Sequence, residues 1–188
     1  MIRGMIMMNL PSVTDVYDFW FNELEAQDHF IKNPSLDTKI KDRFEPLWQA
    51  AKNGELWSWR QSTTGCLAEI IVLDQFSRNM YRNQAKAFQQ DALALVLAQE
   101  LYNNPQFNQL TKEEKQFTCL PFMHSESLTV HEQWTIPIYQ KHLPDIMSIE
   151  EAHYQQLKQF GRYPFRNDAL NRPSTNEEQE FMRHHDNF

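Results

Sequence analysis

The sequence predicts an all-α protein built from antiparallel helix pairs. Glycine is scarce, with 4 residues in a chain of 188, whereas a β-sandwich needs glycine at its many turns. Glutamine, glutamate, alanine and leucine, which favour helices, are frequent. Apolar residues recur at helical spacing, and the links between these segments are short. We therefore expect seven to nine helices.

The first half of the chain contains four helical patterns. The first covers residues 14–25, where Val16, Phe19, Trp20 and Leu24 recur at helical spacing and Ser12 or Thr14 can cap the start. The second expected helix covers 36–51, between Asn33-Pro34 and the stop signal Asn53-Gly54. The third covers 62–76. The fourth covers 84–103 and ends before Asn104-Pro105.

In the second half, three capping boxes predict helix starts. They begin at Thr111, Ser148 and Thr175, each with a glutamate three residues later. The Ser148 helix is expected to run to Phe160, with Gly161 as its C-cap. A further helix over 125–140 is expected to kink or end early at its internal proline.

Charge and composition exclude several classes of protein. The net charge of −7 opposes binding to nucleic acid or to an anionic membrane. The sequence has no apolar run of about 18 residues, which a membrane-spanning helix needs, and its N-terminus lacks the pattern of a signal peptide. We therefore expect a soluble, cytoplasmic protein. A single helical domain is expected over 12–182, with flexible ends at 1–11 and 183–188.

Motifs for cofactors and metals are missing from the sequence. Cys66 and Cys119 lie in apolar helical patterns and have no ligand spacing around them, which predicts reduced, buried thiols rather than a zinc site. No phosphate-binding glycine loop or dinucleotide fingerprint occurs. We expect no cofactor and no metal, and the sequence leaves the oligomeric state open.

Asp74 lies on the apolar stripe of the third helix and should therefore face the interior. A buried carboxylate must be paired or protonated, and Arg78, four residues on, has the spacing of an ion pair. This pair either locks two helices together or orients Arg78 toward a ligand. Asn79 and Arg82 follow at the end of the helix, where binding residues are common.

Two histidines and a glutamate are candidates for chemistry. His124 and Glu126 lie at a helix boundary and are the tentative catalytic pair, as general acid and base. The alternative for Glu126 is a favourable charge at the positive end of the next helix, with Ser125 as its cap. A metal shared with His131 lacks ligand spacing. His153 falls on an apolar stripe, where a hydrogen-bonded core histidine is the commoner outcome.

The strongest local signal is an arginine-rich segment, 160–167, which we call the arginine loop. Gly161 permits a left-handed cap, and Pro164 prevents the helix from continuing. Arg162, Arg166 and the turn residue Asn167 would then be held rigidly, which suits recognition of carboxylate or phosphate. The alternative is that each arginine caps a helix C-terminus or pairs with an acidic residue of this acidic protein.

Four stretches taken together resemble one bacterial family. They are 17–21, 73–82, 120–126 and 153–167 with 172–175, in that order, and the resemblance covers about residues 16 to 181. In these motifs the chain is similar to the bacterial domain-of-unknown-function family 924 (DUF924). The resemblance implies a fold similar to tetratricopeptide-like superhelical arrays and no established activity. Phe165 stands where the family usually has histidine, which weakens any role for a base inside the loop, and Asn171 stands where the family usually has glycine.

The candidate ligand-binding residues are Asp74, Arg78, Asn79, Arg82, His153, Arg162, Arg166 and Asn167. Together they predict a polar pocket for a small anion that bears phosphate or carboxylate. A peptide- or protein-binding scaffold is the alternative, which would expose aromatics such as Trp57, Trp59 or Trp134 along a groove. In a third interpretation, all the polar motifs serve helix packing alone.

Overall fold

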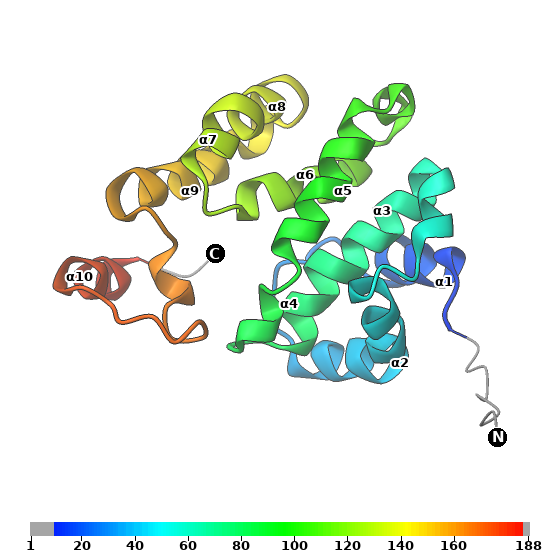
Figure 1. The fold of residues 1–188 in the computed structure, drawn as a ribbon, viewed down its shortest axis with the longest axis horizontal. Helices are drawn as coiled ribbons and strands as arrows, with labels where there is room; N and C mark the ends of the chain where they lie inside the picture. Colours follow the sequence, from blue (N-terminus) through cyan, green and yellow to red (C-terminus); the bar gives the residue numbers. More distant parts are fainter. Residues whose placement is uncertain (1–9, 186–188) are drawn as a thin grey trace.

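The computed structural model describes residues 10–185 and is all-α over that range, with 74% helix, no strands and eight helices (Figure 1). The eight helices therefore agree with the seven to nine that the sequence predicts. Several consist of an α-helix with a π-helical turn, so one helix can carry more than one label. Their bounds are α1 Val13–Asp18, α2 Pro34–Lys52, α3 Thr63–Ile71, α4 Ser77–Met80, α5 Asp91–Asn103, α6 Lys112–His124, α7 Leu128–Val130, α8 Ile136–His142, α9 Met147–Phe160 and α10 Asn176–His184.

Caps read from the sequence account for several helix ends. Ser12, Thr111 and Thr175 each form a capping box with the residue three positions later. Gly161 ends α9 in the left-handed conformation, with φ of 70°, as its glycine predicts.

Three predicted helix starts are wrong. The start at Gln84 fails because a short 3-10 turn, Ala85–Ala87, precedes α5, which begins at Asp91. Ser125 ends α6, and Ser127 caps the next helix. Ser148 caps nothing, because the turn Pro144–Ile146 leads directly into a helix that already begins at Met147.

The described residues contain three π-helical turns, one of which, Phe19–Glu23, ends the first helix, whereas the other two join helices. Of these two, Val72–Phe76 joins α3 to α4 and contains Asp74. The other, His131–Thr135, joins α7 to α8 just before Pro137, whose missing N–H removes a helical hydrogen bond. Such turns often occur at functional sites, and Val72–Phe76 lies against the cavity described below.

The core is aromatic-rich and lies where α1, α2, α3, α5 and α6 meet. Helix α3 packs against α1, α5 and α6, and α2 packs against the α3–α4 junction. Trp20, Trp48 and Phe76 are among the largest fully buried side chains. Helices α8 and α9 pack on one another beside α6, and α10 contacts the arginine loop. Figure 1 shows α9 and α10 on the opposite side of α5 and α6 from α1 and α2.

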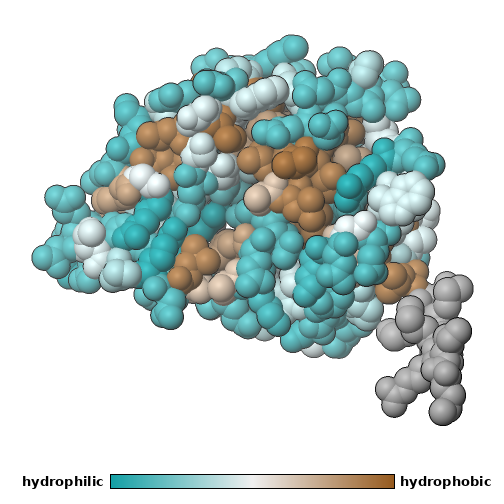
Figure 2. Space-filling model, in the orientation of Figure 1, coloured by the Kyte–Doolittle hydropathy of each residue, from teal (hydrophilic) through white to brown (hydrophobic). Residues whose placement is uncertain are grey.

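The tetratricopeptide-like arrangement and the single-domain boundaries remain predictions. The predicted flexible ends, 1–11 and 183–188, fall mostly outside the residues that the structure describes. Within the described residues, no helix combines the length and the apolar character needed to cross a membrane. The face seen in Figure 2 is mainly hydrophilic, with apolar residues gathered near its centre over α5 and α6.

Candidate functional site

A cavity of about 420 Å³ lies between the α3–α4 junction, the end of α6, the start of α9 and the arginine loop. Its polar and charged lining consists of His29, Lys32, Gln75, Arg78, Asn79, Arg82, Asn83, Gln116, His124, His153, Gln156, Tyr163 and Arg166. Its apolar lining consists of Phe30, Ile31, Ala87, Phe88, Leu120, Met123, Ile146, Ile149, Phe165 and Ala169. None of these lining residues carries a carboxylate.

Asp74 lies fully buried behind the cavity wall and is held by three side chains. Its Oδ1 lies 2.7 Å from His124 Nδ1 and 2.9 Å from Arg78 Nη1, and its Oδ2 accepts a hydrogen bond from Gln75 at 2.5 Å. Burial raises the pKa of Asp74, but Arg78 and His124 lower it more, so the pKa lies well below its usual value. The predicted Asp74–Arg78 ion pair is thus present, and Asp74 is ionised.

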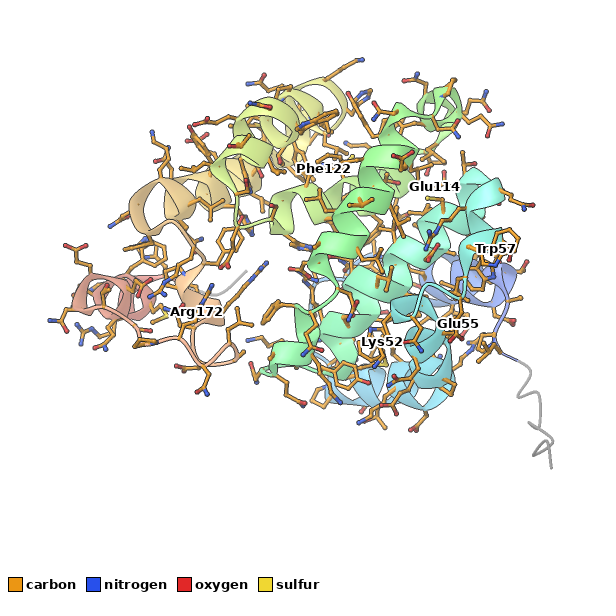
Figure 3. The ribbon with its side chains drawn as sticks, in the orientation of Figure 1. Lys52, Glu55, Trp57, Glu114, Phe122 and Arg172 are labelled. Carbon is orange, nitrogen blue, oxygen red and sulfur yellow. The ribbon has the colours of Figure 1, made fainter. Side chains whose placement is uncertain are left out.

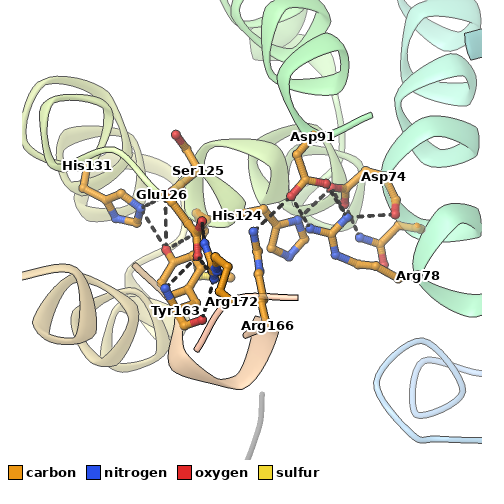
Figure 4. Close-up of polar contacts among 12 residues, drawn as sticks. Asp74, Arg78, Asp91, His124, Ser125, Glu126, His131, Tyr163, Arg166 and Arg172 are labelled. Carbon is orange, nitrogen blue, oxygen red and sulfur yellow. Dashed lines mark hydrogen bonds and ion pairs between the residues drawn. The ribbon is translucent and has the colours of Figure 1, made fainter. Parts of the chain in front are cut away.

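Two arginines of the cavity share one carboxylate (Figure 4). Arg78 binds Asp91 through two hydrogen bonds of 3.0 Å, and Arg166 Nη1 lies 3.2 Å from Asp91 Oδ2. Arg166 also lies between the rings of Phe88 and Tyr163, 4.7 Å from each centroid. Among the described residues, its Nε and Nη2 make no hydrogen bond. The guanidinium of Arg166 is therefore rigidly placed and keeps free donors.

His124 is oriented by Asp74. Burial and the charge of Arg78 lower the pKa of His124, against the opposing effect of Asp74, so the ring is neutral near pH 7. Nδ1 then donates to the ionised Asp74, and Nε2 keeps its lone pair. In the described chain Nε2 has no hydrogen-bond partner. His124 lines this cavity and also a second one of about 330 Å³ on the far side of Arg166.

Asn79 and Arg82 line the cavity from the end of α4, and both bind Asp37 of α2. Arg82 makes two hydrogen bonds to Asp37, of 2.7 and 2.8 Å, and Asn79 donates another of 2.8 Å. Arg82 is about one-third exposed. Asp37 therefore fixes this wall of the cavity.

His153 is buried in α9, and its Nδ1 lies 2.8 Å from the carbonyl oxygen of Ile149. Burial is the main reason that the pKa of His153 falls to about 3, so this ring is neutral at physiological pH. The core histidine expected from the apolar stripe is thus what the structure contains, but His153 also lines the cavity.

Three other predicted site residues lie outside the lining of this cavity. Arg162 makes two hydrogen bonds to Glu178, of 2.7 and 2.9 Å, and Asn167 bonds to Ser174 and Glu178. Glu126 borders the second cavity, accepts two hydrogen bonds from Arg172 and accepts one of 2.7 Å from the backbone N–H of Tyr163. These contacts attach the arginine loop to α10 and to the end of α6.

The sequence interpretation missed a buried network behind the loop. Tyr163 donates a 2.6 Å hydrogen bond to the Met123 carbonyl, and its hydroxyl oxygen lies 3.1 Å from His131 Nε2. His131 Nδ1 lies 2.6 Å from Glu150, whose pKa is raised by burial despite this contact. Asp37 was also missed, because an acidic residue in the first turn of a helix is ordinarily explained by the helix dipole. Asp91 was missed because the predicted helix 84–103 placed it in the helix interior, whereas it begins α5.

The described residues contain no group of three or more histidine, cysteine, aspartate or glutamate side chains placed to hold a metal ion. Cys66 and Cys119 are free and buried, and burial raises the pKa of both thiols.

Trp57, Trp59 and Trp134, the tryptophans of the scaffold hypothesis, do not line this cavity. Trp57 is 65% exposed, and Figure 3 shows it on the opposite side of the molecule from Arg172. Trp134 is partly buried and packs against Tyr102 and Phe122.

Comparison with known proteins shows which family this chain belongs to. Residues 16–186 match the model of a bacterial protein family of unknown function, DUF924, and the chain belongs to that family. It is also similar to the solved structure of a protein of unknown function from Agrobacterium tumefaciens, with 29% sequence identity and a TM-score of 0.86. That similarity covers 92% of this chain and 97% of the other. No curated protein matches the sequence.

Proposed function

We propose that this protein binds a small anionic ligand in the 420 Å³ cavity. The observation that supports the proposal most is the positive charge of the cavity lining. Lys32, Arg78, Arg82 and Arg166 border the cavity, and no carboxylate does. In a chain with a net charge of −7, such a one-sided arrangement is unexpected for a solvated surface. The volume falls in the range of small-molecule sites, about 300 to 1,000 Å³.

The arginines are prepared for recognition rather than free to move. Asp74, Asp91 and Asp37 lie behind or beside them and fix their orientation. Arg166 keeps unused N–H groups between two aromatic rings, which suits a bidentate hydrogen bond to a carboxylate or phosphate.

A thermal-shift screen of carboxylated and phosphorylated metabolites tests the proposal. Ligands that raise the Tm of the native chain should lose that effect in Arg166→Gln and Arg82→Gln. Arg43→Gln is the matched control, because Arg43 pairs with the partly exposed Glu23 and does not line the cavity. The proposal fails if no anion stabilises the protein, or if the stabilisation persists in both cavity variants.

A second candidate function is proton transfer to or from the bound ligand. It is favoured by the Asp74–His124 contact, which presents a neutral imidazole with its Nε2 lone pair available, as in a general base. Arg78 and Arg166 would stabilise the negative charge that remains on the ligand when His124 takes a proton. Of the two residues that the sequence suggested as catalytic, His124 lines the cavity, whereas Glu126 is held by Arg172.

Hydrogen–deuterium exchange of the ligand itself tests this second function. A carboxylate found in the screen is incubated in D₂O, and its C–H signals are followed by proton NMR. Exchange or turnover by the native protein that disappears in His124→Gln supports proton transfer. A ligand that binds and stays unchanged shows a binding protein instead.

A further inference from the structure

We infer that the ligand is a monoanion with an apolar body, that is, a hydrophobic carboxylate rather than a phosphate ester. The inference rests on the proposed anion site and specifies what that site takes. Two features support it: the charge balance around the cavity, and the apolar side chains at its mouth.

The positive charge of the cavity is almost balanced within the protein. Arg78 and Arg166 face Asp74 and Asp91, and Arg82 faces Asp37. Burial keeps two of the three lining histidines, His124 and His153, neutral, and the third, His29, lies 3.7 Å from the carboxylate of Glu113, which is not part of the lining. Lys32 is the cation in excess, so Lys32, the three arginines and their three aspartates sum to one positive charge.

One excess positive charge favours a ligand with one negative charge. A carboxylate would be neutralised on binding. A phosphate monoester carries about 1.5 to 2 negative charges near pH 7. Its second charge would be removed from water without a partner, which is costly. Arg166 can donate hydrogen bonds to a carboxylate or to a phosphate, so the total charge of the ligand is what distinguishes the two.

Apolar side chains surround the mouth of the cavity. Seven large apolar side chains are well exposed in the described chain, and three of these line the cavity: Phe30 at 63%, Ile31 at 57% and Ile149 at 40% exposure. Leu120, Met123, Ile146 and Phe165 continue the apolar wall inward. Exposed apolar side chains that gather around a cavity indicate a surface that a ligand covers.

These features place the two parts of the ligand. The carboxylate would accept hydrogen bonds from the free donors of Arg166, near Arg78. Its hydrocarbon part would lie against Phe30, Ile31 and Ile149 and would remove their surface from water.

Isothermal titration with four probes tests the inference: octanoate, acetate, 1-octanol and octyl phosphate. We expect octanoate to bind at least tenfold more tightly than each of the others. Lys32→Gln should weaken octanoate about fivefold through the lost charge, and Ile149→Ser about fivefold through the lost apolar contact. Both side chains are exposed, so both variants should fold.

Matched controls separate these effects from general changes in charge or hydropathy. Lys158→Gln removes the same charge from an exposed lysine of α9, and Leu128→Ser removes an exposed apolar side chain; neither residue lines the cavity. Both controls should bind octanoate as the native chain does.

The outcomes distinguish this inference from the proposed function. If octyl phosphate binds more tightly than octanoate and Arg166→Gln abolishes its binding, the anion site stands and the carboxylate assignment is overturned. If octanol binds as tightly as octanoate, or if none of the anions binds, the proposed anion site and the inference both fail.

Discussion

At the scale of single residues, each arginine of the cavity is held by a carboxylate from another part of the chain. Asp91 binds Arg78, 13 residues before it, and Arg166, 75 residues after it, and Asp37 holds Arg82 across 45 residues. These partly buried pairs cost desolvation, so their presence at a cavity suits pre-organisation of a site more than a gain in stability.

Asp74→Asn should destabilise the protein by about 1.5 to 3 kcal/mol, because it leaves Arg78 with Asp91 as its one carboxylate partner and disturbs the bond to His124. Urea unfolding measures this loss. Asp145→Asn is the control, because Asp145 and its partner Lys112 are both exposed. The loss of unfolding free energy in this variant should stay under about 1 kcal/mol. A similar small loss for both variants would contradict the account of Asp74.

His153 should make stability depend on pH. Its pKa is about 3 in the folded protein and about 6.5 in an unfolded chain, so between these values only the unfolded chain binds the proton. Stability should therefore fall as pH falls below about 6.5. Between pH 6.5 and 5.5 this one group contributes about 1 kcal/mol of loss. Urea unfolding at both pH values should show a smaller loss in His153→Gln, and equal losses would argue against a neutral, buried ring.

The sequence predicted the local pair and missed the distant ones. Asp74 and Arg78 are four residues apart on one helix, so helical geometry alone brings them together. The contacts of Arg172 with Glu126 and of Arg162 with Glu178 depend on how helices pack. The residue types in the arginine loop therefore indicated recognition of acidic groups, but could not show that Arg162 meets the protein's own glutamate.

At the scale of elements, caps were the most reliable signal. The capping boxes at Thr111 and Thr175 depend only on side chains within one turn, so sequence alone specifies them. The box at Ser148 has the same pattern and fails because the preceding turn starts the helix earlier. The π-helical turns also escaped prediction, since a wider turn changes the helical period only locally.

Helix α10 depends on one buried glutamate. The Glu178 carboxylate accepts hydrogen bonds from the backbone N–H of Thr175, which caps the helix, and from Arg162 and Asn167. The hydrogen bond from Arg162 is the main reason that the pKa of Glu178 falls to about 2. Glu178→Ala should therefore raise amide hydrogen exchange in 176–184 before it affects the core. Glu177→Ala, an exposed change in the same turn, should leave this exchange nearly unchanged. If α10 keeps its protection without Glu178, other contacts must hold it.

At the scale of the whole molecule, the site is assembled from segments that are far apart in the sequence. Members of the segments 29–32, 78–82, 146–153 and 163–166 border one cavity. The sequence showed polar motifs at helix ends, but only the packing of the whole chain places the ends of α4 and α6, the start of α9 and the arginine loop around one cavity. The exposed Phe30 and Ile31 carried no recognisable signal, because their role depends on that packing.

A bound anion should protect these distant segments together. We expect amide hydrogen exchange in 29–32, 146–149 and 163–166 to slow when a screened ligand saturates the protein, because the ligand contacts all three. The turn Trp57–Gln61, which does not line the cavity, serves as the internal control. Protection confined to one segment would indicate a surface site instead.

The central claim is that the cavity takes an anion at Arg166 and Arg78. A crystal structure with the tightest-binding carboxylate of the screen tests it most directly. The account predicts that the carboxylate oxygens lie within hydrogen-bond distance of the Arg166 guanidinium, with the apolar part against Ile149 and Phe30. A ligand bound elsewhere on the protein, with only solvent in the cavity, would contradict it.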